Sequence, residues 1–344
     1  MSNLNYSAPR GQNPRKSSIG CVTPLLMFVA IMLVMGHLIV VVGVIRFFSG
    51  SPAEDGPTYT GTDGYVAVLS VEGIITTQNT TGSLFVEPEA YNHNYLIKTL
   101  NQLSNDSDNK GVLLYIDSPG GEVYATDELY IEIMKYKENT GRPVYAYCAQ
   151  IAASGGYYIA SAADQIFMNR NGLTGAIGVS AGTFIDLSEF LEEQGIKTTS
   201  IYVGENKAMG NMFEEFTVEQ REIYLSILQE TYDQFVDVIT EGRPLTRDEV
   251  VGLSDGRIFS PNQALELDLI DGIMTYDEAR ERFLIEMEWS DETQYLQFRP
   301  DTTPRFSDIL IMMSRGRKTD LETYLSYLDI PFEGFAYYYE GPRF

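Results

Sequence analysis

An uncharged apolar run over residues 21–45 sets the main constraint on how this chain can fold. The run reads CVTPLLMFVAIMLVMGHLIVVVGVI and contains no Asp, Glu, Lys or Arg. At about 1.5 Å of rise per residue, a helix of this length crosses a hydrocarbon core of about 30 Å. A cleavable signal peptide has a shorter apolar core of about 7–15 residues and a small-residue cleavage site. The sequence that follows, RFFSGSPAED, has no clear site of that kind. We therefore predict an uncleaved transmembrane helix.

Charges on either side of the run predict its orientation. Arg10, Arg15 and Lys16 precede it without any acidic residue, whereas one Arg and then two acidic residues follow it. Because the cytoplasmic flank of a membrane span carries an excess of Lys and Arg, residues 1–20 are expected to be a basic cytoplasmic tail. The rest of the chain then lies outside the cell membrane, and the span itself contacts the lipid. Residues 46–64 are rich in Gly, Pro, Ser and Thr and are predicted to be a linker.

Composition excludes several classes of function. The formal net charge of the 344 residues is −24, which argues against nucleic acid as a partner because phosphate binding needs clustered Lys and Arg. The acidic residues are read instead as a solvated surface. Cys21 and Cys148 are too differently placed to form a disulfide framework. No CxxC or HExxH motif occurs, so we expect neither a metal nor a cofactor.

Beyond the linker, short apolar runs alternate with segments whose apolar residues recur at helical spacing. Such alternation indicates βαβ units and a largely parallel sheet, an α/β fold. Residues 250–274 close the alternating part with a mixed helix and strand pattern. The predicted strands are 65–75, 111–116, 142–148, 164–168 and 198–202, and the predicted helices are 92–103, 124–136, 185–194 and 217–241.

The first candidate site is the loop DSPGGEV, which follows the predicted strand 111–116. Functional sites of α/β sheets form outside the carboxyl ends of strands. Gly120 and Gly121 permit positive φ and a close approach of a ligand to the main chain. The loop can therefore aim free N–H groups at a developing negative charge, as an oxyanion hole requires. The alternative is an ordinary turn.

The second candidate is Ser154 in AQIAASGGYYIASAADQIF, where a strand ends and a helix is expected to begin. The first N–H groups of a helix are unpaired and suit a developing oxyanion. The segment is not the GxSxG nucleophile motif, so Ser154 is either a nucleophile or an N-cap residue. The small residues 160–163 predict a close contact with another element.

A serine nucleophile needs a base, and the chain has only two histidines. His37 lies inside the predicted span, and His93 lies in the polar stretch EAYNHNYL and is predicted to be a surface residue. A neutral Lys can act instead if burial lowers its pKa from about 10.4 toward 7–8. Lys207, in YVGENKAMGNMF, is the best candidate by position. The alternative is a solvated loop lysine.

Five segments occur in a characteristic order: IDSPGGEV, IAASGGYYIASAAD, GLTGAIGV, IYVGENKAMGN and LSDGRIFSPNQALELDLIDGI. Together they resemble the signal peptide peptidase A family of membrane-anchored serine proteases in its single-repeat form. The resemblance implies a Clp protease/crotonase-like fold, which we assign to residues 65–294. It also implies a homo-oligomer, a ring of eight. The substrates would be peptides, namely signal peptide remnants bound extended beside a strand edge.

The resemblance also assigns the catalytic residues. It implies that Ser154 is the nucleophile and Lys207 the general base of a Ser–Lys dyad. The oxyanion hole is implied to consist of the Gly121 and Gly155 N–H groups, with Gly120 as an alternative donor.

One position departs from the family pattern. Members often carry a Ser in GSIGV that helps to hold the lysine, and this chain has Ala176 there. The lysine would then be oriented by Thr174, Ser180 or water.

Residues 295–344 are assigned to a C-terminal extension, which is less covered by the resemblance. Its end, GFAYYYEGPRF, could be a closing strand, a subunit contact or a tail in a neighbouring substrate groove. Two other functions remain open at this point. One is a crotonase-like enzyme that uses the same oxyanion site on an acyl-CoA. The other is a catalytically silent membrane assembly protein, suggested by Ala176.

Overall fold

The computed structural model describes residues 57, 59–77 and 91–300, together with the backbone of 336–338. They belong to the unit that begins at Asp55. The predicted span over residues 21–45 lies outside the described residues. Among those that are described, no helix combines the length and apolar character needed to cross a membrane.

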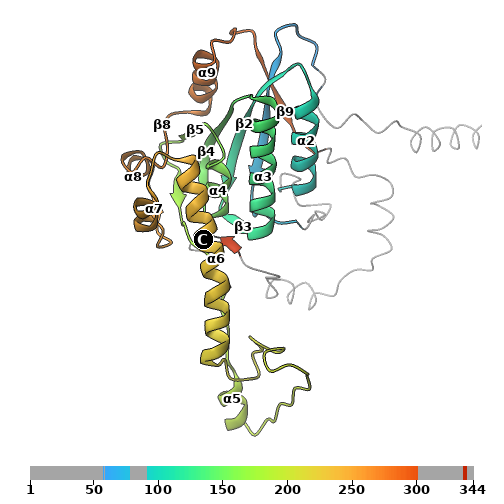
Figure 1. Ribbon diagram of the computed structural model, residues 1–344, viewed down its shortest axis with the longest axis vertical. Coiled ribbons are helices and arrows are strands. Elements are labelled where there is room, and N and C mark those ends of the chain that lie inside the picture. Colours follow the sequence, from blue (N-terminus) through green and yellow to red (C-terminus); the bar gives the residue numbers. More distant parts are fainter. Residues whose placement is uncertain (1–56, 58, 78–90, 301–335, 339–344) are drawn as a thin grey trace, which may run out of the picture. The chain divides into compact units, whose positions relative to one another are not determined.

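The fold is built on a mainly parallel sheet whose central strands are buried on both faces (Figure 1). Its order is β7-β6-β4-β2-β1-β9, with β5 pairing to both β4 and β8. Among the described strands of this sheet, the β6–β7 pair is antiparallel and the other pairs are parallel. The strands are β1 (Tyr65–Glu72), β2 (Asn109–Ser118), β4 (Val144–Ala153), β5 (Gln165–Met168), β6 (Leu173–Gly175), β7 (Ile258–Phe259), β8 (Gly272–Ile273) and β9 (Gln294–Phe298).

Helices connect the strands as βαβ units and cover both faces of the sheet (Figure 1). The helices α2 and α3 follow β1 and β2 and pack against each other, while α9 packs on the opposite face. The helices are α2 (His93–Asn105), α3 (Val123–Thr140), α4 (Gly155–Ala160), α5 (Ser188–Glu193), α6 (Val218–Gly242), α7 (Arg247–Leu253), α8 (Pro261–Glu266) and α9 (Tyr276–Glu286).

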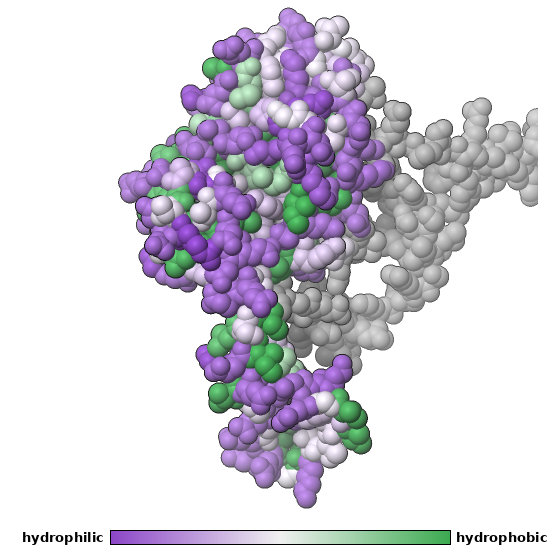
Figure 2. All heavy atoms as spheres, in the orientation of Figure 1, coloured by the Kyte–Doolittle hydropathy of each residue, from purple (hydrophilic) through white to green (hydrophobic). Residues whose placement is uncertain are grey.

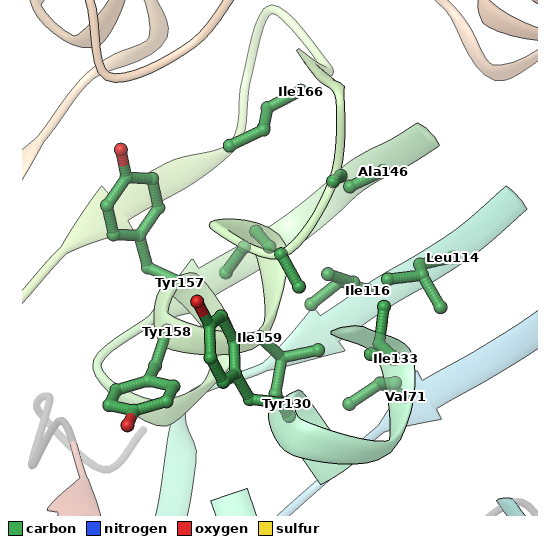
Figure 3. Close-up of a cluster of buried hydrophobic side chains, with 14 of the residues drawn as sticks. Val71, Leu114, Ile116, Tyr130, Ile133, Ala146, Tyr157, Tyr158, Ile159 and Ile166 are labelled. Atoms are coloured by element: carbon green, nitrogen blue, oxygen red, sulfur yellow. The ribbon is translucent and has the colours of Figure 1, made fainter. Parts of the chain in front are cut away.

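Alternate side chains of each central strand enter two different cores. On β1, Val66 and Val68 pack into the cluster that includes Phe283 of α9, whose ring stacks on Tyr145 at a centroid distance of 4.0 Å. The intervening residues of β1 face the larger cluster under α2, α3 and α4 (Figure 3). This period of two is what a strand buried on both faces produces.

Most of the predicted elements are present, and one is wrong. The structure confirms the predicted strands as β1, β2, β4 and β5 and the predicted helices as α2, α3 and α6, with α5 shorter than expected. The predicted strand 198–202 is absent, and this stretch is exposed coil in which Ile201 is 95% exposed. A β-branched run forms a strand only when a partner lies beside it, and here no strand of the sheet is adjacent.

Only the C-terminal part of the long helix α6 packs on the sheet domain. Its buried residues are Phe235, Val236, Val238 and Ile239, and its earlier turns are largely exposed. A Cβ at Gly242 would lie 2.1 Å from the Ser161 carbonyl oxygen, so the two backbones touch here. This contact confirms the close approach predicted from the small residues 160–163.

The prediction that His93 lies at the surface is wrong. His93 begins α2 and is 2% exposed, with Nε2 2.6 Å from Glu128 Oε2 and Nδ1 2.7 Å from the Tyr91 hydroxyl. The polar sequence neighbours of His93 suggest an exposed side chain. The ring can nevertheless be buried, because Glu128 of α3 supplies a carboxylate that hydrogen-bonds to it. The hydrogen bond from His93 lowers the pKa of Glu128.

Two strands, β9 and β10, include residues of the predicted C-terminal extension. β9 spans the predicted boundary between residues 294 and 295, so the sheet includes the first residues of that extension. The short strand β10 (Ala336–Tyr338) pairs antiparallel with β3 (Gly120–Glu122), with Tyr337 opposite Gly121. A segment near the end of the chain therefore lies against the first glycine loop.

Candidate active site

Both glycine-rich segments lie at the same edge of the sheet. β2 and β4 are parallel neighbours, with Ser118 opposite Ala152, so their carboxyl ends are adjacent. The chain leaves β2 through Pro119 into β3, and it leaves β4 through Ser154 into α4. Ligands of α/β sheets bind at this edge. The topology therefore brings together two loops that are more than 30 residues apart in sequence.

Ser154 occupies a strained turn between strand and helix. Its φ of 52° and ψ of −119° are unusual for a residue with a side chain, and such strain persists only where the surroundings enforce it. Here the Ser154 N–H donates to the Gly175 carbonyl at 2.7 Å, and the buried side chains of Tyr157 and Tyr158 anchor α4 in the core (Figure 3). A sharp strand–turn–helix of this kind presents the nucleophile in α/β-hydrolases.

The Ser154 side chain does not cap the helix. It stands at the N-cap position, yet its Oγ makes no capping hydrogen bond. The residue is 1% exposed, and among the described residues its Oγ has no hydrogen-bond partner at all. A buried hydroxyl without a partner costs free energy, so it requires an explanation. The N-cap alternative does not supply one, which leaves the nucleophile hypothesis.

Gly121 presents its backbone toward the site. Ile75 N–H donates to the Gly120 carbonyl at 3.0 Å, and the Glu122 N–H donates to the Ile75 carbonyl at 2.8 Å. Because the polar groups of successive strand residues alternate in direction, the Gly121 N–H and C=O face away from Ile75, toward β10. A Cβ at Gly121 would lie 1.9 Å from the Ile75 oxygen. Only glycine fits at this position.

Gly155 packs directly on this loop. A Cβ at Gly155 would lie 3.3 Å from Gly121 N and 2.7 Å from Thr126 Oγ1. As the first residue of α4, Gly155 has an N–H without an intrahelical acceptor. The N–H of Gly120 is engaged, since it donates to Ser118 Oγ at 3.1 Å. The structure thus brings Ser154, Gly121 and Gly155 together, and Gly121, unlike Gly120, directs its N–H toward the strand edge that β10 occupies.

Replacement of Gly121 with Ala tests how tightly this loop is held. The new methyl group would overlap the Ile75 carbonyl, so we expect a loss of about 3 kcal/mol in the free energy of unfolding together with loss of activity. Gly252→Ala is the matched control, because a Cβ there meets nothing within 4 Å in helix α7 and should stabilise by about 0.5–1 kcal/mol. Chemical denaturation of both variants measures the difference. A Gly121→Ala variant with the same free energy of unfolding as the wild type would contradict the close packing of β3.

Two residues that support the loop escaped the sequence analysis. Ser118 Oγ donates to the Gly73 carbonyl at 2.6 Å and accepts from Gly120. The Asp117 carboxylate accepts from the Ile151 N–H at 3.1 Å and so ties the end of β2 to β4, while burial raises its pKa. The signal was present, because Asp and Ser before a glycine turn often bond to nearby backbone.

Lys207 does not meet Ser154 within one chain. It is exposed on the segment between α5 and α6, near Gly210, where an added Cβ would lie 3.3 Å from the Tyr224 hydroxyl of α6. Tyr224 stands eleven residues before Phe235, the first buried residue of α6, which is about 16 Å of helix. Figure 1 shows this segment extending away from the sheet with α5 at its end. In this single chain Lys207 therefore fits the alternative prediction of a solvated loop lysine.

The residues proposed to orient the lysine are also separate from it. Thr174 is buried on β6, and its hydroxyl donates to the Ala152 carbonyl at 2.6 Å. Ser180 is exposed, and its hydroxyl accepts from the Gly182 N–H at 3.0 Å. Ala176 lies between them with a φ of 48°. Within the described part of the chain, no hydrogen bond joins Thr174 or Ser180 to Lys207.

Other catalytic chemistries have little support. Cys148 is fully buried on β4, and desolvation raises the pKa of its thiol to about 12, so it is not a thiolate nucleophile near neutral pH. In the ranges that the structure covers, no cluster of three or more His, Cys, Asp or Glu could hold a metal ion. The arrangement at the ends of β2 and β4 fits attack by a hydroxyl on a carbonyl carbon, with backbone N–H groups receiving the charge.

Comparison with known proteins agrees with this geometry. A family model described as Peptidase family S49 matches residues 136–289, and one described as Clp protease matches residues 75–174. The chain is 32% identical to a candidate signal peptide peptidase SppA of Enterococcus faecium, over 76% of this chain and 75% of that protein. It is 26% identical to Protease 4 of Haemophilus influenzae and 29% identical to the chloroplastic serine protease SPPA of Arabidopsis thaliana. Those matches cover 77% and 62% of this chain but only 42% and 31% of the two relatives.

Both family matches include Ser154 and the end of β4. The Clp protease match also contains the β2–β3 glycine loop, in agreement with the expected fold. The S49 match extends through the segment that carries Lys207. Since one relative is about one-third identical over three quarters of both proteins, the chain belongs to the signal peptide peptidase A proteins of the S49 family of serine proteases.

Proposed function

We propose that the chain is a membrane-anchored serine endopeptidase that degrades signal peptide remnants through a Ser154–Lys207 dyad. The observation that carries the proposal is the buried Oγ of Ser154, which has no partner in the described part of the chain and is held on a strained turn close to Gly121 and Gly155. Residues 21–45 anchor the chain with its amino terminus in the cytoplasm and the catalytic domain outside. This location suits a substrate that is itself an apolar, membrane-derived peptide.

The proposed chemistry assigns one role to each of these groups. Neutral Lys207 takes the proton of Ser154, and Oγ attacks the carbonyl carbon of a peptide bond. The Gly121 and Gly155 N–H groups stabilise the oxyanion of the tetrahedral intermediate. The lysine ammonium returns the proton to the leaving amine, which departs and leaves an acyl-enzyme. Water, deprotonated by the same lysine, attacks the ester, releases the second product and restores the Ser154 hydroxyl.

The lysine reaches the serine between two copies of the chain. Lys207 lies too far along the extended segment to reach Ser154 of its own chain, and that segment exposes many apolar side chains (Figure 2). Exposed apolar surface of this extent indicates a protein–protein contact. A homo-oligomer, a ring of eight by family resemblance, supplies a neighbouring Ser154. Exposed apolar residues between positions 185 and 225 include Ile185, Phe190, Ile196, Ile201, Val203, Met212, Phe213, Val218 and Leu225.

The peptide substrate binds as an added strand beside β3. In this chain β10 takes that place, pairs antiparallel with β3 and lies close to α3 and α4. An extended peptide on the same edge would receive main-chain hydrogen bonds from Gly121. Its scissile carbonyl would then lie next to Ser154. Main-chain hydrogen bonds of this kind depend little on the side chains of the peptide, which fits a protease whose signal peptide remnants vary in sequence.

A serine-directed phosphonate tests the function directly. The full-length chain in detergent micelles should be labelled on Ser154, as located by mass spectrometry of the digested protein. Ser154→Ala should remove the label, and Lys207→Ala should slow labelling about 100-fold or more because the base is lost. Lys197→Ala is the matched control, since Lys197 is another exposed lysine of the same segment and should leave the rate unchanged.

The labelling experiment also separates the other functions. A folded, oligomeric chain that is not labelled would contradict the proposal and support a catalytically silent assembly. Binding of CoA without cleavage of any peptide would support the crotonase-like alternative.

A further inference from the structure

Thr126 carries a buried hydroxyl that no described part of the fold pairs. It lies in the first turns of α3 and is 0% exposed, and its Oγ1 has no hydrogen-bond partner among the described residues. Leaving a buried hydroxyl unpaired is unfavourable, and a Val of the same shape would avoid the cost. A residue of this type in this position therefore indicates a partner that is absent from the single chain.

Most other helical hydroxyls of this chain are satisfied locally, and Thr99 of α2 is the exception among the described residues, since it is also buried without a hydrogen-bond partner. Ser and Thr in helices commonly donate to the carbonyl four residues earlier. Those that do so here are Ser104, Thr140, Ser161, Thr231, Thr240 and Ser254. For Thr126 that carbonyl belongs to Glu122, and the bond is not made. The Thr126 hydroxyl is thus turned away from its own helix.

The hydroxyl lies beside Gly155, one of the two proposed oxyanion donors. Thr126 Oγ1 lies 2.7 Å from the point where a Gly155 Cβ would stand, and Gly121 N lies 3.3 Å from the same point. The Thr126 hydroxyl oxygen and the Gly121 nitrogen therefore both lie close to the same side of Gly155. Ser154, which precedes Gly155, has the other unpaired hydroxyl of this region. Gly155 is needed here because any side chain would displace the Thr126 oxygen.

We propose that Thr126 is a catalytic residue whose hydroxyl donates a third hydrogen bond to the oxyanion, beside the Gly121 and Gly155 N–H groups. This inference rests on the proposed function. The bond forms only when the carbonyl oxygen of a bound peptide acquires negative charge, which explains why the hydroxyl is unpaired in the free chain. An interaction that is stronger in the transition state than in the ground state raises kcat rather than lowering KM.

The test compares Thr126→Val with Thr126→Ser in the full-length oligomer. Thr126→Val keeps the shape and removes the hydroxyl, so kcat for a fluorogenic peptide should fall about 100-fold with KM nearly unchanged. Its thermal unfolding midpoint should stay the same or rise, because an unpaired buried polar group is gone. Thr126→Ser keeps the hydroxyl and should retain kcat within a few-fold. Ser154→Ala gives the background rate.

Three outcomes would overturn the inference. One is a Thr126→Val variant as active as the wild type. Another is an equal loss of kcat in Thr126→Val and Thr126→Ser. The third is a loss of kcat in Thr126→Val together with a lower thermal unfolding midpoint. Either of these two results would indicate that Thr126 acts through packing alone. If the wild-type chain itself neither cleaves peptides nor reacts with a phosphonate, the proposed function fails as well. An active wild type with a fully active Thr126→Val variant contradicts only the role of Thr126.

Discussion

Replacement of Ser154 with Ala should lower kcat/KM for peptide cleavage by about 10⁵-fold or more. The reason is that neither the thiol of β4 nor the serine at the end of β2 can replace it: Cys148 is fully buried, and Ser118 is engaged with Gly73 and Gly120. The residual rate would come from the N–H groups of Gly121 and Gly155, which remain able to polarise a bound carbonyl. Steady-state cleavage of a fluorogenic peptide by the detergent-solubilised oligomer measures the loss.

The same substitution should not weaken the fold. The Ser154 hydroxyl makes no hydrogen bond to any residue that the structure describes, so its removal is expected to leave the free energy of unfolding unchanged or about 1 kcal/mol higher. Ser154→Gly should be more stable still, because glycine adopts a φ near 52° without strain. Both variants would thus be inactive and at least as stable as the wild type. If Ser154→Ala instead destabilised the chain and retained activity, Ser154 would be structural.

The sequence predicted the parts of the site that depend on local pattern and topology. Continuous apolar runs identified β2 and β4, and glycines at their ends located the two loops. Because neighbouring parallel strands end at the same edge, Gly121 and Ser154 could be expected to meet. The structure places them together and adds the positive φ of Ser154.

Other features depend on contacts that no local pattern reports. The burial of His93 depends on Glu128, which lies 35 residues later on another helix. The segment 198–202 has the composition of a strand but no neighbouring strand. Thr126 has no distinguishing sequence context, because its unpaired hydroxyl becomes visible only when α3 and α4 are packed together. Ser118 and Asp117, by contrast, could have been recognised from the DSPGG motif.

Replacement of Lys207 is expected to have the second large effect on activity. Lys207→Ala should lower kcat/KM about 10³-fold or more, because the general base is lost. Since Lys207 is exposed on the surface, where its side chain makes few contacts to lose, the variant should fold and assemble normally. Lys197→Ala on the same segment serves again as the control and should keep full activity. A Lys207→Ala variant as active as this control would remove Lys207 from the mechanism.

Mixing the two inactive variants then decides where the lysine comes from. When Ser154→Ala and Lys207→Ala chains are co-expressed with different affinity tags, assemblies that contain both are isolated by two successive purifications. If each site joins Ser154 of one copy to Lys207 of the next, about a quarter of the sites in a random ring combine an intact serine with an intact lysine. Activity should therefore recover to about a quarter of the wild-type rate per chain.

A dyad within one chain predicts no recovery at all, because every chain then carries a defect in its own site. The structure favours recovery, since about 16 Å of α6 separates the level of Lys207 from the sheet that holds Ser154. For the chain to bring its own lysine to its own serine, the segment before α6 would have to leave the Phe184–Tyr224 contact, where the rings lie 4.8 Å apart. Doubly purified assemblies that stay inactive would show that this rearrangement takes place, and Lys207 would then act on the serine of its own chain.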